Sequence, residues 1–311
     1  MKKLFFAVVA VAAFLTACSN DVAIIGTNKT KVTFTINSPE LTTRYFGDGH
    51  EAKNLYYAVY DAVEGGLVTG LSKIQTPDNI SVGEKKEVTM YLVEGRTYDI
   101  IFYAESGNSP YKLDWTNQTL EVANPAALKS NMEDYDAFYA HVDKLYVGTN
   151  KINEDVFLKR PFAQLNILTN DIALGSAAGI DITKTSVTVS EVYTKMNLFT
   201  DKIDTASEAA VTFAMNKAPM TEAVVNGIKY HCLSMNYLLV NAKKTVDVTF
   251  TMQDRDYATG DGKLVRSYPS IFVERNHRTN IYGSIITNPA KFNVEILPGF
   301  EDPYNYDADQ K

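Results

Sequence analysis

The feature that most constrains the fold is a series of short segments in which polar and apolar residues alternate. Lys31–Asn37 is the clearest of them, with Val32, Phe34 and Ile36 as its apolar half. Side chains alternate between the two faces of a β-strand, so this pattern predicts a strand with one buried face. Such a strand needs a second layer to cover it, which predicts packed sheets.

Similar segments recur along the chain between turns rich in Gly, Pro, Asn and Asp. This pattern is typical of all-β sandwiches, and we expect two in tandem, over residues 31–157 and 158–311. The boundary is placed at Phe157–Pro161. Predicted strands of the first series are Lys31–Asn37, Asn54–Tyr60, Glu87–Val93, Thr97–Ala104 and Thr119–Val122. A second series begins near Val156 and comprises Pro161–Thr169, Ser186–Tyr193, Ala210–Met215, Lys229–Val240, Thr245–Gln253, Leu264–Glu274, Thr279–Ile286 and Lys291–Leu297.

Two connections carry more specific predictions. Val93–Thr97 contains Gly95 and predicts a tight hairpin between the strands on either side of it. Pro125–Val142 predicts the one short helix of the fold, because it opens with proline and alanines. Its apolar residues recur at helical spacing, at Met132, Tyr135, Phe138, Tyr139 and Val142.

The N-terminus has the pattern of an export signal. Lys2 and Lys3 precede an apolar run, Leu4–Phe14, that is too short to anchor stably in a bilayer. Leu15-Thr16-Ala17-Cys18 then resembles a bacterial lipobox, in which the cysteine is diacylated and becomes the first mature residue. We therefore predict a signal peptide over 1–17, lipidation at Cys18 and a tether over 18–30. The alternative is an ordinary signal peptide with an incidental cysteine.

The mature chain is acidic, which bears on its partners. Removal of residues 1–17 leaves 28 Lys and Arg against 37 Asp and Glu, a formal charge of −9. This balance disfavours nucleic acid and anionic lipid headgroups as partners. Cys232 is the one cysteine after Cys18 and lies in an apolar segment, so we predict a buried, inert thiol.

No pattern of catalytic residues is present, and we expect neither an enzyme nor a cofactor or metal. The sequence lacks G-x-S-x-G and H-E-x-x-H, and its four histidines have no ligand spacing. Asp254-Arg255-Asp256 begins like a calcium loop, but Ala258 and a missing terminal glutamate break the pattern. A hydrolase built on carboxylates distant in sequence stays open as an alternative.

The aromatic residues suggest a second class of function. Nineteen tyrosines and one tryptophan could form a platform on which sugars stack. The best candidate for an exposed aromatic is Trp115, while Tyr56, Tyr57 and Tyr60 lie in a predicted strand that places some of them in the core. A structural role for Trp115 is the favoured alternative.

The order of several weak motifs resembles that of fimbrillins, the fimbrial subunits of Bacteroidales. The resemblance extends over most of the mature chain, and it lies in the order of the motifs. The matching segments are the lipobox, Val32–Ile36, Thr43–Gly47, Leu55–Tyr60, Gly95–Ile101, Lys159–Leu165 and Arg278–Tyr282.

The resemblance implies transthyretin-like or Greek-key sandwiches and assembly by strand exchange. The first strand, Lys31–Asn37, would be removed with the lipid by a cut between Arg44 and Tyr45, and another subunit would donate a replacement strand. The donor would come from Lys291–Leu297 and beyond. Tyr45 departs from the small residue common in the family, and Arg44 can also be a solvated loop cation.

The predicted function is therefore a fimbrillin-like surface lipoprotein, a shaft, anchor or tip subunit that supports adhesion. Ser19 follows Cys18 where an aspartate favours inner-membrane retention, so the expected location is the outer membrane or cell surface. Expected partners are other fimbrial subunits and a surface ligand. The alternative is an outer-membrane glycan-binding lipoprotein for nutrient capture.

Overall fold

The structure, a computed structural model, describes residues 28–38, 47–215, 220–253, 262–288 and 292–297. Within these ranges the protein is nearly all β, as predicted. The first strands are β1 (Lys29–Asn37), β2 (Asn54–Asp61), β3 (Lys73–Asn79), β4 (Lys85–Val93), β5 (Thr97–Glu105), β6 (Tyr111–Asp114), β7 (Thr119–Val122), β8 (Lys129–Ser130), β9 (Ala137–Tyr146) and β10 (Ile152–Phe157).

Most of the later strands lie within a few residues of the bounds predicted for the second series. They are β11 (Ala163–Thr169), β12 (Asp181–Tyr193), β13 (Lys195–Asn197), β14 (Lys202–Ile203), β15 (Glu208–Met215), β16 (Met220–Val225), β17 (Ile228–Leu238), β18 (Lys243–Gln253), β19 (Lys263–Glu274), β20 (Arg278–Gly283) and β21 (Phe292–Leu297). The helix α1 (Ile172–Ala177) is short, and no helix in the described ranges is long and apolar enough to cross a membrane.

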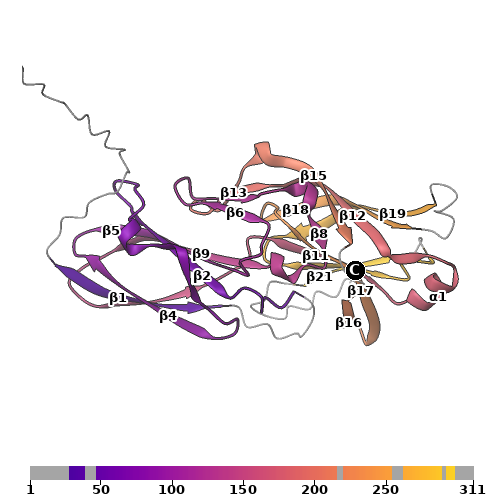
Figure 1. Cartoon of the computed structure of the whole chain (residues 1–311), viewed down its shortest axis with the longest axis horizontal. Helices are drawn as coiled ribbons and strands as arrows, with labels where there is room; N and C mark the ends of the chain where they lie inside the picture. The colour runs from indigo at the N-terminus through magenta and orange to yellow at the C-terminus, as the bar shows by residue number, and fades with distance from the viewer. Residues whose placement is uncertain (1–27, 39–46, 216–219, 254–261, 289–291, 298–311) are drawn as a thin grey trace, which may run out of the picture.

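The first part of the chain packs two sheets against each other, at the left of Figure 1. The β1 sheet has the order β10-β1-β4, and the β5 sheet has the order β3-β2-β5-β9. Apolar residues from both sheets form one core, among them Phe34, Leu55, Met90 and Phe102. The β1 sheet and the β5 sheet therefore form a sandwich.

The second part of the chain repeats this arrangement with longer strands. The β11 sheet has the order β16-β17-β11-β20-β21, and the β12 sheet has the order β19-β18-β12-β15-β8. A small sheet, β14-β13-β7-β6, joins strands of both halves and lies between the two sandwiches in Figure 1. Apolar residues between the β11 and β12 sheets form a second core. This second core extends past the small sheet to the outer face of the β5 sheet, where it includes Ala58, Ile101 and Tyr103.

The predicted helix over Pro125–Val142 is wrong. The segment forms a turn of 3₁₀ helix at Pro125–Ala127, the short β8, a second 3₁₀ turn at Glu133–Tyr135, and most of β9. Both faces of the β5 sheet are covered, so Ala137–Ala140 are all buried instead of alternating. A continuous apolar run of this kind does not distinguish a buried strand from a helix.

The predicted hairpin at Val93–Thr97 is also wrong. Gly95 turns the chain with a φ of 78°, but β4 pairs with β1 while β5 pairs with β2 and β9. The turn therefore crosses from one layer of the sandwich to the other. Turn residues indicate a change of direction and do not determine which strands pair.

Candidate functional site

The candidate assembly site is β1 and the groove that it fills. β1 lies between two strands, antiparallel to β4 across Lys29–Asn37 and parallel to β10 across Val32–Asn37. No two of these three strands are adjacent in sequence. Without β1, two facing rows of backbone donors and acceptors on β4 and β10 would lose their partners.

The apolar half of β1 lies in the core of the first sandwich. Val32, Phe34 and Ile36 are each 0% exposed, which confirms the predicted register. The Phe34 ring contacts the ring of Phe102 in the facing sheet, with centroids 5.3 Å apart. Because each side chain fills its own position, the groove under β1 is a row of apolar pockets that another strand of the same alternation would fit.

Side chains also hold the two ends of β1. At the start, the Thr30 hydroxyl donates to the carbonyl of Gly148 at 2.7 Å. Beyond the end, Ser38 Oγ accepts from the backbone N–H of Gly83 at 2.9 Å. Gly83 lies in the turn between β3 and β4, so the end of β1 is attached to the first sandwich.

Several predicted site residues lie outside the described residues, and their roles stay predictions. They are the lipidation site Cys18 and the cut site Arg44–Tyr45. The predicted donor strand is described in part, as β21. In the structure β21 pairs antiparallel with β20 of its own chain, at one edge of the β11 sheet.

The sequence does not reveal the parallel partner of β1. No strand was predicted over Ile152–Phe157, yet β10 completes the β1 sheet and contributes Val156 to the first core. The sequence signal was weak, because the polar Glu154 interrupts the face that Ile152 and Val156 share. To assign β10 to the β1 sheet, one must know which strands pair, and only the tertiary structure shows that.

The aromatic candidates are packed inside the fold. Tyr57 and Tyr60 are buried, and the Tyr60 hydroxyl donates to the Trp115 carbonyl at 2.7 Å. Trp115 is half-buried, with its ring 6.5 Å from that of Tyr56 and against the second core. Tyr57, Tyr60 and Trp115 therefore form structural contacts within the fold.

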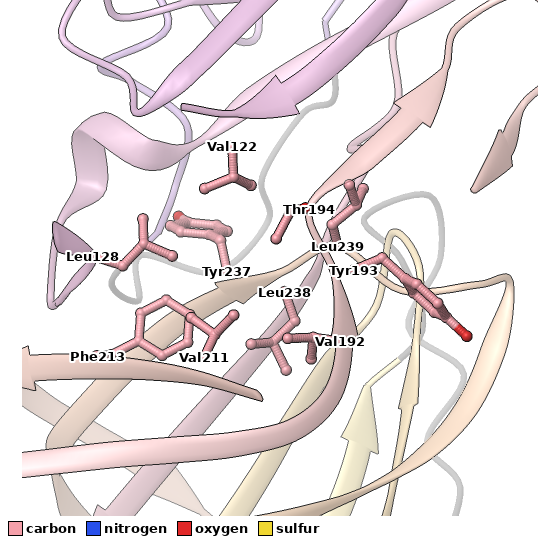
Figure 2. Close-up of a pocket in the computed structure, with 10 residues that line it drawn as sticks. All are labelled: Val122, Leu128, Val192, Tyr193, Thr194, Val211, Phe213, Tyr237, Leu238 and Leu239. Carbon is pink, nitrogen blue, oxygen red and sulfur yellow. The ribbon is translucent and has the colours of Figure 1, made fainter. Parts of the chain in front are cut away.

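A small cavity lies within the second core (Figure 2). Side chains from β7, β12, β15 and β17 surround it, including Val122, Phe213 and Tyr237, and its volume is about 10 Å³. That volume holds one water molecule at most, so the cavity is a packing defect and not a ligand site.

One grouping of titratable side chains was not apparent from sequence spacing. The ligand atoms of Asp99, His141 and Asp143 lie within 4.8 Å of one another, and the His141 ring stacks on Phe199. Asp99 is buried and accepts from the Lys144 amide at 3.0 Å, so its position is explained without a metal, and we assign none.

Cys232 is 0% exposed, and burial raises the pKa of its thiol, which confirms the predicted inert cysteine.

The architecture defines a class, an all-β protein of two packed sandwiches whose first strand is central to its sheet. Within it, the chain belongs to DUF6562, a family of unknown function whose model matches residues 25–311. No curated protein matches the chain.

Solved structures are similar to this chain at low sequence identity, and the first of the two below has the same fold. A candidate cell adhesion protein of Bacteroides ovatus is 11% identical, with 88% of this chain and 99% of that chain covered and a TM-score of 0.50. The fimbrial anchor protein Mfa2 of Porphyromonas gingivalis is 10% identical, with 86% and 97% covered and a TM-score of 0.47.

Proposed function

We propose that this protein is a fimbrillin-like lipoprotein of the bacterial surface, a structural subunit that supports adhesion and has no enzymatic activity. The observation that carries the proposal is the position of β1, which is paired on both sides and fills its groove with Val32, Phe34 and Ile36. The fold shared with the candidate cell adhesion protein of Bacteroides ovatus supports it, as does the order of the fimbrillin-like motifs.

In this proposal the chain is exported, acylated at Cys18 and held at the outer membrane with β1 in place. A cut after Arg44 then frees β1 together with the lipid. The vacated groove has unpaired backbone on β4 and β10 and open apolar pockets, which favours a strand donated by another subunit. Residues from Phe292 onward are the proposed donor, because β21 lies at a sheet edge with one neighbour, β20.

Limited trypsin treatment of the purified mature chain tests the proposal. We expect a product that begins at Tyr45 and forms ladders of oligomers on native gels. Arg44→Ala should stay intact at this site and monomeric, and a cut chain without residues 291–311 should stay monomeric for want of a donor. A trimmed full-length chain that remains monomeric at high concentration would contradict the assembly role.

A glycan-binding lipoprotein is the second candidate, and one surface feature favours it. Tyr146 is 63% exposed beside an open depression lined by Asn28, Glu94 and Thr149. An exposed aromatic with neighbouring polar groups is suited to stacking on a sugar. Retention on immobilised polysaccharides, lost in Tyr146→Ala but kept in Tyr91→Ala, would favour this function over the first.

A further inference from the structure

The chain re-enters the described structure at Gly47, and two buried arginines hold it there. The Gly47 carbonyl accepts from Nη2 of Arg160 at 3.1 Å and lies 3.4 Å from Nη2 of Arg278. Arg160 is 1% exposed and Arg278 is 5% exposed. A carbonyl bound by two desolvated guanidinium groups makes charge-assisted hydrogen bonds, which are stronger than those between neutral groups.

Each arginine is fixed by a further partner. Arg160 forms a bidentate ion pair with the buried Asp136, and its guanidinium lies 4.6 Å from the centre of the Phe138 ring. Arg278 Nε donates to Gln164 Oε1 at 2.5 Å. Burial and the neighbouring Arg160 lower the pKa of Arg278 to about 10, so it remains a cation at neutral pH.

The close packing around residues 47–49 requires glycine at both ends of this segment. Gly47 has a φ of +70°, and a Cβ there would lie 2.2 Å from Gln164 Nε2 and 2.8 Å from the Tyr237 hydroxyl. Gly49 has a φ of +79°, and its Cβ would lie 2.6 Å from Phe138 Cζ. Both the backbone conformation and the close approach therefore exclude larger residues.

The two ends of the segment from Ser38 to Gly47 are attached to different parts of the molecule. Ser38 is bound to the turn between β3 and β4, in the first sandwich. Gly47 lies against Gln164 of β11, Tyr237 of β17 and Arg278 of β20, all in the β11 sheet of the second sandwich. From Gly49 the chain returns to the first core at Ala52 and continues into β2.

We propose that Gly47, Gly49, Arg160 and Arg278 form a retention clamp. The clamp holds the chain downstream of residues 39–46 in place after a cut within that segment. The cut then detaches β1 alone, while β2 keeps its anchored start and does not fray. This role rests on the proposed maturation, but the clamp itself can be tested with any imposed cut.

The sequence offers an internal reporter of the clamp. After Arg44 the next tryptic site is Lys53, whose side chain is 64% exposed. Proteolysis there requires local opening of the backbone around Lys53, so its rate measures how firmly the clamp holds this segment. Mass spectrometry of the released peptide, residues 45–53, follows that rate after the cut at Arg44.

Gly47→Ala is the test variant, and Gly65→Ala is its matched control. Gly65 has a φ of +72° with nothing within 4 Å of its Cβ, so the control reproduces the backbone strain without the crowding. We expect release of residues 45–53 to be about tenfold faster in Gly47→Ala than in the wild type, and unchanged in Gly65→Ala. Arg278→Gln, which shortens the donor while avoiding the clash, should accelerate release in the same direction.

Hydrogen exchange on the uncut chain gives a second measurement that needs neither proteolysis nor maturation. The Ala52 amide, which donates to the Gly49 carbonyl, should exchange about tenfold faster in Gly47→Ala than in Gly65→Ala. Equal exchange, or equal release of residues 45–53, in the two variants would overturn the clamp. Absence of a cut at Arg44 on cells would contradict the proposed maturation and leave this comparison intact.

Discussion

At the scale of single residues, the alternation in β1 determines which substitutions the first sandwich tolerates. Phe34 is fully buried and contacts Phe102, whereas Thr33 is on the outer face, beside Thr89 of β4. The two positions are neighbours in sequence and have opposite environments. They therefore provide a direct test of the register.

Phe34→Asp should destabilise the protein by about 3–5 kcal/mol, because it removes a buried ring and places an unpaired charge in the core. Thr33→Asp should change stability by less than about 1 kcal/mol. Thr33 is a better control than Thr35, which lies opposite Glu87 and Asp155 and would gain like-charge neighbours. Urea unfolding measures both variants, and equal midpoints would contradict the register.

Asp171 gives a prediction about pH. Burial raises its pKa, but hydrogen bonds from Thr169, from Thr287 and from the Ile286 amide outweigh that effect, and the net pKa lies below the ordinary value of 3.8. A lowered pKa in the folded state stabilises the fold above the unfolded pKa, and this stabilisation is lost as the pH falls through the folded pKa. Asp171→Asn should therefore lose stability less steeply than the wild type below about pH 4. Melting temperatures across this range measure the difference, and parallel curves would exclude the assignment.

At the scale of elements, burial on both faces explains why some segments do not show their strand character. β5 is buried at every position from Tyr98 to Ala104, because the β1 sheet covers one face and the second core covers the other. β9 has the same environment at its start, which is where the helical spacing misled the sequence prediction. Strands in the β1 and β12 sheets keep one exposed face and show clear alternation.

The helix α1 provides a prediction at this scale. A Cβ on Gly175 would lie 2.5 Å from Cγ2 of Ile286, so Gly175→Ala should destabilise the protein by about 1–3 kcal/mol. This sign is opposite to the stabilisation that Gly→Ala gives in an open helix. Leu174→Ala, at a position 64% exposed, is the control and should change stability by less than about 0.5 kcal/mol. Stabilisation by Gly175→Ala in urea unfolding would show that α1 does not dock as described.

At the scale of the whole molecule, contacts that are distant in sequence connect the two sandwiches. The Phe199 ring contacts the rings of Tyr60 and His141 in the β5 sheet, and the Tyr139 hydroxyl of β9 donates to Asp201 Oδ1. The retention clamp adds the Gly47 carbonyl to this junction. The start of β2 thereby depends on residues more than a hundred positions later in the chain.

Membrane attachment is a property of the whole molecule that a single residue controls. Cys18→Ala should abolish acyl labelling and release the protein from membrane fractions, because residues 18–311 carry a formal charge of −9, which disfavours contact with anionic lipid. Fractionation with metabolic acyl labelling measures both effects. Retention of the unlabelled variant in the membrane fraction would contradict the lipoprotein assignment.

The sequence by itself determined the fold class, most strands and the inward face of β1. These properties are local, since alternation and turn residues act over a few positions. It also identified Cys232 as buried, because the residues around it are apolar.

Only the tertiary structure decided which strands pair, that β4 and β5 belong to different layers, and that β9 replaces a helix. Strand pairing depends on hydrogen bonds between distant residues and on burial of both faces of a sheet. Neither of these leaves a periodic pattern in the local sequence. Arg160 and Arg278 show most clearly what the sequence alone does not reveal. A sequence places two arginines at strand ends as surface cations, and only the packed junction, with Asp136, Gln164 and the Gly47 carbonyl as partners, stabilises them inside.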